Sequence, residues 1–215
     1  MAIAFPYDVL EGFPGWSTDF QLLWRQEQSR TAGGQTLVKD LGSPLWSTTY
    51  LTRTLRPNEL DAWRARLDVL ENGLNQFVGR PLSRCYPIAY PRPVFDSLFP
   101  AFGAAAINSI NANRKAISLK NLPANYKLSV GDMITIGSGT TFNLHRVMEA
   151  ATANGSGVTP QFEIRPHLWP LTAENNLAAI HNPFCLMTIV PGSISSTADL
   201  STGRGVISFQ AVESR

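Results

Sequence analysis

The 215-residue sequence predicts a mainly β fold: a β-sandwich with one packed amphipathic helix, followed by a second small β-barrel-like domain. Three observations support this class. Short runs rich in β-branched and aromatic residues recur along both halves, separated by Gly and Asn turns. Helical spacing of apolar residues occurs in one segment, residues 58–72. A proline-rich tract separates the halves, and the length suffices for two self-sufficient cores.

The first half opens with strands. Large apolar side chains occupy every second position from Phe20 to Trp24, and a further run follows at residues 36–41. Gly33 and Gly34 lie between these runs and predict a hairpin turn. Residues 44–55 (PLWSTTYLTRTL) are rich in Thr, Leu and aromatic residues, which predicts a third strand.

The helix is expected over residues 58–72, opened by Pro57 or Asn58 and ended by Gly73 in a left-handed cap. Arg64 and Asp68 form a possible i,i+4 ion pair. The apolar stripe, which we expect to lie on a small antiparallel sheet, consists of Leu60, Trp63, Leu67, Leu70 and Leu74.

Prolines crowd residues 80–93, which predicts an edge strand running into a stiff linker. The Ala- and Asn-rich tract at 99–113 extends this connection. We therefore expect a ring-forming domain at 1–90, a linker at 91–113 and a second domain at 114–215. Residues 183–215 can belong to either domain.

Short strands divided by turns also predict a small barrel or sandwich in the second half. Gly, Asn, Asp and Ser residues predict turns at 131–132, 137–139 and 154–157. The expected strands are residues 115–119, 133–136, 142–150, 158–168, 184–190 and 206–212.

Charge argues against nucleic acid as the main partner. The net charge is +2, and the charges are dispersed without a basic stripe. Residues 97–113 and 175–198 contain no charged side chain. They are too interrupted by Pro, Gly and Asn to span a membrane. Two interpretations remain: surface that contacts other proteins, or polar loops with buried strands.

Two cysteines, Cys85 and Cys185, stand far apart without a CxxC motif. This spacing favours buried thiols in a reducing compartment over a disulfide framework. The first residues, MAIAFPYDVLEGF, contain no basic region and do not have the pattern of a secretion signal. We therefore expect a protein made in a cytoplasm.

Catalytic patterns are missing from the sequence. His145, His167 and His181 have no partner at metal-ligand spacing, and no HExxH, GxSxG or Gly-Lys-Ser/Thr string occurs. The carboxylates are mostly isolated, so a glycosidase pair is not evident. We therefore expect no catalytic, cofactor-binding or metal-binding residues, and no cofactor.

The five tryptophans allow two interpretations. Core or interface packing is favoured over stacking on sugars. The loop around Trp169 is the one plausible start of a sugar site. The five are Trp16, Trp24, Trp46, Trp63 and Trp169.

The run FPGWSTDFQLLWRQEQSRTAGGQTLVKDLGSPLWSTTYLTRTL, with the following NELDAWRARLDVLENGLNQF, resembles the start of distal tail and minor tail proteins of long-tailed bacteriophages. The strings SLKNLPANYKLSVGDMITIG, LHRVMEAATANGSG and QFEIRPHL resemble a small β-domain found in the same proteins.

This resemblance implies a structural virion component and no catalytic residue. It implies a ring, commonly a homohexamer, that joins the tail tube protein to the hub, tape-measure or receptor-binding proteins of the tail tip or baseplate. Assembly would begin in the bacterial cytoplasm.

Three alternatives stay open. A carbohydrate-binding tail module would need exposed aromatic side chains beside Asn and Asp. A tail-completion or terminator ring would keep the phage context at another position. A wall-degrading hydrolase would need two carboxylates or a metal site.

Overall fold

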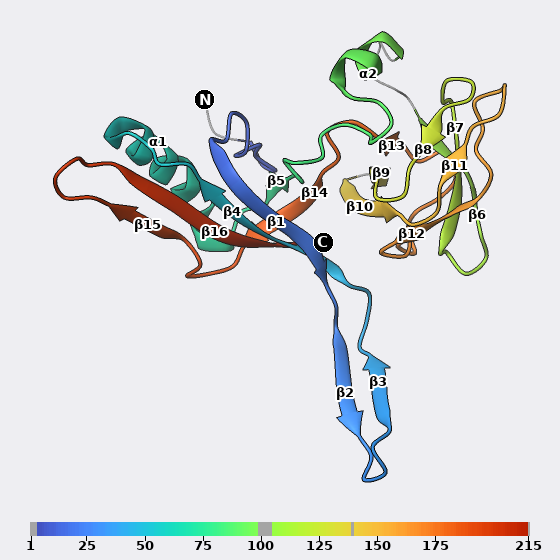
Figure 1. The fold of residues 1–215 in the computed structure, drawn as a ribbon, viewed down its shortest axis with the longest axis horizontal. Helices are drawn as coiled ribbons and strands as arrows, with labels where there is room; N and C mark the ends of the chain where they lie inside the picture. The colour runs from blue at the N-terminus through green and yellow to red at the C-terminus, as the bar shows by residue number, and fades with distance from the viewer. Residues whose placement is uncertain (1–3, 99–104, 139, 215) are drawn as a thin grey trace.

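The computed structural model describes residues 4–98, 105–138 and 140–214. The chain is mainly β with one main helix, which confirms the expected fold class (Figure 1). The first domain contains one six-stranded antiparallel sheet. Its order along the sheet is β1 (Gly15–Leu23), β4 (Leu45–Thr52), β16 (Gly205–Glu213), β14 (Cys185–Ile189) and β5 (Phe77–Gly79), with β15 (Ser195–Ala198) also paired to β16.

The second domain is a nearly closed, barrel-like sheet. A bridge between Ala106 and Leu177 connects its two ends. A short ladder of β8 (Lys127–Leu128) and β11 (Ala151–Thr152) lies beside it. The order of its strands is β13 (Ala178–Ala179), β9 (Met133–Ser138), β10 (Thr141–Val147), β12 (Phe162–Arg165), β7 (Ala116–Lys120) and β6 (Ala106–Ile110).

The barrel is inserted into the first domain. The chain leaves the first sheet after β5, builds the barrel, and returns with β14, β15 and β16. Residues 183–215, left open by the sequence, thus contribute three strands to the first sheet. The stretch expected as a linker, 91–113, contains α2 (Arg92–Leu98) and barrel strand β6, while its residues 99–104 lie outside the described part. The expected turn at 137–139 likewise includes one position, 139, outside the described part.

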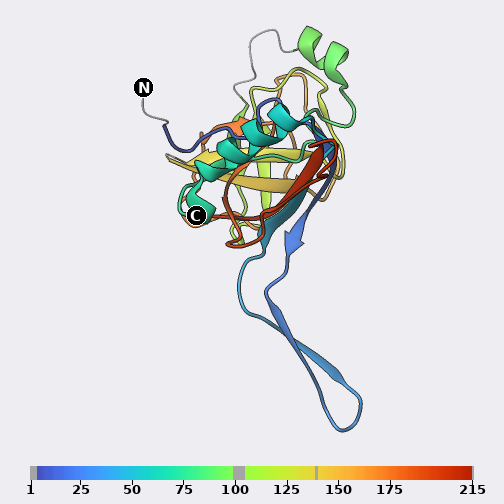
Figure 2. The ribbon, with the colours of Figure 1, turned by 90° about the vertical axis from the view of Figure 1, so that its left-hand side faces the viewer.

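One face of the first sheet carries the core. Alternate residues of β4 and β16 are buried, the period expected when one face of an antiparallel sheet is covered. Trp46, Tyr50 and Phe209 are fully buried on this face. The covering layer is α1 (Pro57–Asp68) instead of a second sheet (Figures 1 and 2).

Three details of the expected helix were wrong. The α-helix ends at Asp68, because Glu71 and Asn72 have positive φ in the following 3-10 turn (Glu71–Gly73). Leu74 is consequently turned to solvent with 79% exposure and is not part of the apolar stripe. Arg64 pairs with Asp61 at 3.0 Å, an i,i+3 pair, instead of with Asp68.

Trp46 joins the two domains. Its indole N–H donates to the carbonyl of Leu144 in β10 at 2.7 Å, and the Arg146 guanidinium lies 5.1 Å from the ring centroid. Met133 and Leu144 of the barrel pack into the hydrophobic core of the first domain. The barrel therefore shares buried surface with the first domain in addition to its two chain connections.

We expect Trp46→Phe to lower the free energy of unfolding by about 1–3 kcal/mol, because the buried Leu144 carbonyl loses this donor. Urea denaturation followed by fluorescence and circular dichroism should show one transition for both domains. Trp63→Phe is the matched control, since Trp63 is only partly buried. Two separated transitions in the unmodified protein would contradict the shared core.

Gly73 adopts φ +104°, and a Cβ there would overlap the carbonyl oxygen of Ile189. We expect Gly73→Ala to destabilise the protein by more than about 1 kcal/mol in thermal unfolding. Gly155→Ala is the control, because no atom lies within 4 Å of its Cβ position and its φ is ordinary. Equal melting temperatures for the two variants would show that the Gly73 turn tolerates a side chain.

Candidate assembly surface

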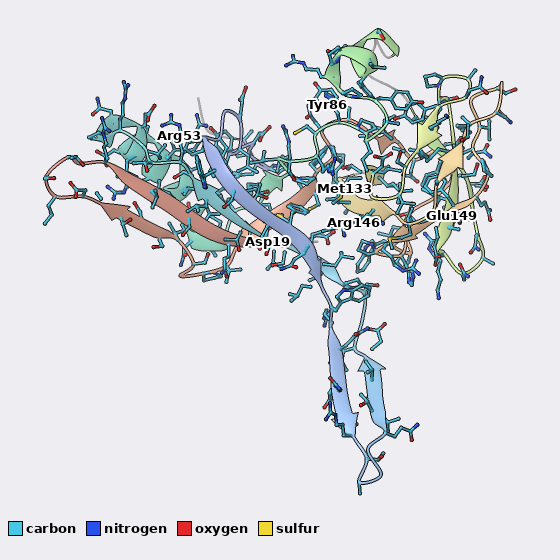
Figure 3. All side chains as sticks on the ribbon, in the orientation of Figure 1. Asp19, Arg53, Tyr86, Met133, Arg146 and Glu149 are labelled. Atoms are coloured by element: carbon cyan, nitrogen blue, oxygen red, sulfur yellow. The ribbon has the colours of Figure 1, made fainter. Side chains whose placement is uncertain are left out.

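A two-stranded hairpin, hereafter the arm, projects from the first domain (Figures 1 and 2). It consists of β2 (Gln26–Arg30) and β3 (Thr36–Asp40), which among the described residues pair with each other alone. Every residue from 23 to 41 is exposed. The all-side-chain view shows the arm's side chains standing clear of both domains (Figure 3).

The arm presents apolar side chains on both faces. Leu37 and Val38 are 49% and 60% exposed, and as consecutive strand residues they point in opposite directions. Leu23, Trp24 and Leu41 are also exposed at its base. A lone two-stranded hairpin is at best marginally stable in water. Covering these side chains with another molecule would supply the missing stabilisation.

Charges on the arm are nearly balanced and stand away from its middle. Glu27 faces Lys39 across the strands near the base, a favourable opposite-charge pair. Arg30 lies at the tip end of β2. The central pairs, Gln28 with Val38 and Ser29 with Leu37, are uncharged.

Strand β1 leads directly to the arm and forms an edge of the first sheet. One side of β1 pairs with β4, and its other side pairs with no strand within the described residues. An exposed edge of nine residues offers backbone groups to an incoming strand. Asp19 is the one charged residue in this strand.

A β-bulge turns Trp16 outward at the start of β1. Gly15 pairs with Thr52 and Ser17 with Leu51, so Trp16 is the extra residue between them. Its side chain is 78% exposed. Gly15 allows a close approach here, because a Cβ would lie 3.1 Å from the ring of Phe13.

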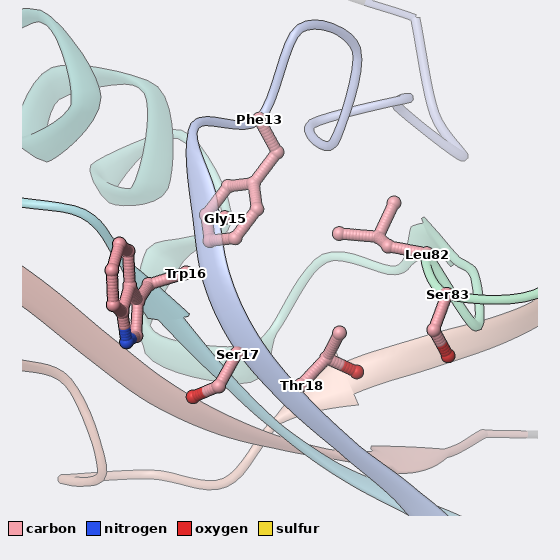
Figure 4. Close-up of a pocket in the computed structure, with 7 residues that line it drawn as sticks. All are labelled: Phe13, Gly15, Trp16, Ser17, Thr18, Leu82 and Ser83. Carbon is pink, nitrogen blue, oxygen red and sulfur yellow. The ribbon is translucent and has the colours of Figure 1, made fainter.

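Beside Trp16 lies a shallow groove of about 550 Å³ (Figure 4). Each of the seven lining residues is uncharged. We call this the Trp16 groove, and it is lined by Phe13, Gly15, Trp16, Ser17, Thr18, Leu82 and Ser83.

The Leu82–Ser83 wall of this groove is held by buried contacts. The Tyr50 hydroxyl donates to the carbonyl of Arg80 at 2.7 Å and accepts from its N–H at 3.0 Å. Burial raises the pKa of Tyr50 well above its usual range, so the hydroxyl stays protonated. The Arg80 guanidinium pairs with Asp8. The wall is therefore fixed to the core of the first domain.

The charge-poor stretch at 175–198 is explained largely by burial. Its middle forms β14, in which Cys185, Leu186 and Met187 are buried. Its exposed part is concentrated towards β15. The stretch at 97–113 includes barrel strand β6, and its residues 99–104 lie outside the described part.

The tryptophans separate into two groups. Trp46 is fully buried and Trp63 and Trp169 are partly buried, whereas Trp16 and Trp24 are exposed. The sequence favoured core or interface packing for all five and singled out only the loop around Trp169 as a possible sugar site, so it did not predict the exposure of Trp16 and Trp24. It also missed Leu37 and Val38 as surface residues. One signal was available: the sequence of β2, QEQSR, contains no apolar residue that could face a core.

The three histidines of the sequence are buried or partly buried. His145 is buried, and its Nδ1 lies 2.8 Å from the carbonyl oxygen of Pro166. Burial lowers the pKa of His167. Within the described ranges, no three side chains of His, Cys, Asp or Glu are placed to bind a metal ion together. Cys85 and Cys185 are both free thiols.

No protein-family model matches this chain, and no curated protein has a significantly similar sequence. The helices in the described part are too short or too polar to cross a bilayer.

We expect that replacing residues 26–40 with Asn-Gly, which closes a tight turn between Arg25 and Leu41, will change the free energy of unfolding by less than about 0.5 kcal/mol. The physical reason is that the arm is exposed along its whole length and that its two strands, within the described residues, pair only with each other. Urea denaturation of the dilute protein measures this. A loss above about 1 kcal/mol would show that the arm stabilises its own chain.

Proposed function

We propose that this chain is a structural protein that assembles with copies of itself into a ring within a phage tail tip or baseplate. In that position it connects the tail tube to the hub or receptor-binding proteins. The observation that carries the proposal is the arm, with Leu37 and Val38 exposed on opposite faces of a hairpin whose strands, among the described residues, pair only with each other.

The exposed surfaces of the arm and of the β1 edge support self-assembly. Another molecule can cover the apolar side chains on the two faces of the arm, and the free edge of β1 can form backbone hydrogen bonds with an incoming strand. Two different surfaces on one chain produce head-to-tail contacts, and such contacts close into a ring when the rotation per subunit divides a full turn. A permanent interface of this kind buries more than about 1,000 Å².

The phage context is supported by the resemblance of the N-terminal run and the following helix to distal tail proteins. The same resemblance suggests six subunits and a barrel that faces a partner. The firm attachment of the barrel through Trp46 suits a part that transmits force between neighbours in a virion. A terminator ring remains the alternative position in the tail.

We test the proposal by measuring mass in solution with light scattering across a concentration series. The unmodified chain is expected to form a discrete oligomer near six times 23.6 kDa, about 142 kDa. The chain with residues 26–40 replaced by Asn-Gly is expected to remain a monomer, with a mass slightly below the 23.6 kDa of the full chain, because the arm is lost while the domains stay folded. A monomer at every concentration, or rings unaffected by loss of the arm, would contradict the proposal.

A further inference from the structure

We propose that the arm of one copy docks in the Trp16 groove of the next copy, beside the free edge of β1. This inference rests on the proposed self-assembly and adds the two surfaces that meet. It commits to a second copy of this chain as the occupant of the groove.

The first argument is distance within one chain. The groove is lined by residues 13–18 at the start of β1, whereas the arm begins beyond Leu23 at its other end. A strand of nine residues spans about 30 Å. The arm points away from the domain that carries the groove (Figures 1 and 2). The structure thus holds the arm outside its own groove, which leaves that groove open to the arm of another copy.

The second argument is chemical match. Burying a charge without a partner costs several kcal/mol, so an uncharged groove selects an uncharged segment. The middle of the arm has that composition, since Gln28, Ser29, Leu37 and Val38 are neutral and the charges lie towards its two ends. The hydroxyl groups of Ser17 and Ser83 on the groove can bond to the polar side chains of β2.

The third argument is the bulge at Trp16. The extra residue in β1 holds a large aromatic side chain in solvent, although the same strand could have paired regularly with β4. β-Bulges commonly re-aim a side chain at sheet edges. An exposed Trp is the kind of residue that anchors an interface, and the Trp16 side chain lies across β1 from Leu82 and Ser83 (Figure 4). Leu37 or Val38 of the incoming arm supplies an aliphatic side chain that packs on the Trp16 ring.

The arm and the Trp16 groove that receives it are thus different surfaces at opposite ends of the same domain. Each copy gives its arm to one neighbour and receives an arm from another. The contact is heterologous, and it agrees with ring closure without requiring two arms to pair with each other.

We test this contact by photo-crosslinking the full-length chain. Val38→Cys is introduced with Cys85→Ser and labelled with benzophenone maleimide, while buried Cys185 stays in place. After irradiation at concentrations where oligomers form, peptide mapping is expected to find crosslinks to residues 13–18 and 82–83. The matched label at the exposed position of Asp68→Cys, on the last residue of α1, is expected to give none there.

A second measurement uses variants that keep both native cysteines. Trp16→Ser is expected to raise the concentration for half-assembly about tenfold or more, with unchanged circular dichroism. Leu74→Ser removes an apolar side chain that is 79% exposed, against 78% for Trp16. This control is expected to leave the concentration for half-assembly unchanged.

The outcomes separate this inference from the proposed function. Rings in which the Val38 label reacts elsewhere, or with another arm, and in which Trp16→Ser assembles normally, overturn the docking site and leave self-assembly standing. A chain that stays monomeric at every concentration overturns both.

Discussion

The pairing of β4 with β16 is the contact on which the rest of the molecule depends. It brings together parts of the chain that flank the whole inserted barrel, as in the bond from the Ile207 N–H to the Thr52 hydroxyl across 155 positions. The same two strands present Trp46, Tyr50 and Phe209 to the core under α1. From this core, Trp46 fixes the barrel and Tyr50 fixes the wall of the Trp16 groove.

The arm differs from this rigid base in that its apolar side chains are exposed. Apart from the arm, the apolar side chains of the first sheet are largely buried on its helix-covered face. The arm leaves that base from the end of β1 and carries its apolar side chains outward. A preorganised binding surface such as the Trp16 groove lowers the entropy cost of binding. The arm is already a paired hairpin, so fewer of its residues become ordered on binding than in a disordered tail. The chain therefore presents one projecting element and one fixed surface, and these two together can make repeated contacts between copies.

Local signals in the sequence predicted the local structure well. The helix, the turn at Gly33–Gly34 and the strands β9, β10, β14 and β16 follow from short-range periodicity and turn chemistry. The run at residues 20–24, expected on one side of that turn, instead lies largely in β1 and pairs with β4. The return of β14–β16 to the first sheet was not predictable in this way, because strand partners more than a hundred positions apart leave no local pattern. The outward position of Trp16 depends on a bulge, and bulges are set by the register with a neighbouring strand. The sequence of β2, without apolar residues, was the one readable indication that a strand would stand outside the core.

The most direct test of assembly through the arm is amide hydrogen exchange, compared between dilute and concentrated protein. The account predicts that the amides of residues 26–40 and of the outer edge of β1 exchange rapidly in the dilute protein. They should become protected when oligomers form, while the amides of α1 keep the same rates at both concentrations. Unchanged, rapid exchange along the arm in the assembled protein would contradict the claim that the arm is what holds the copies together.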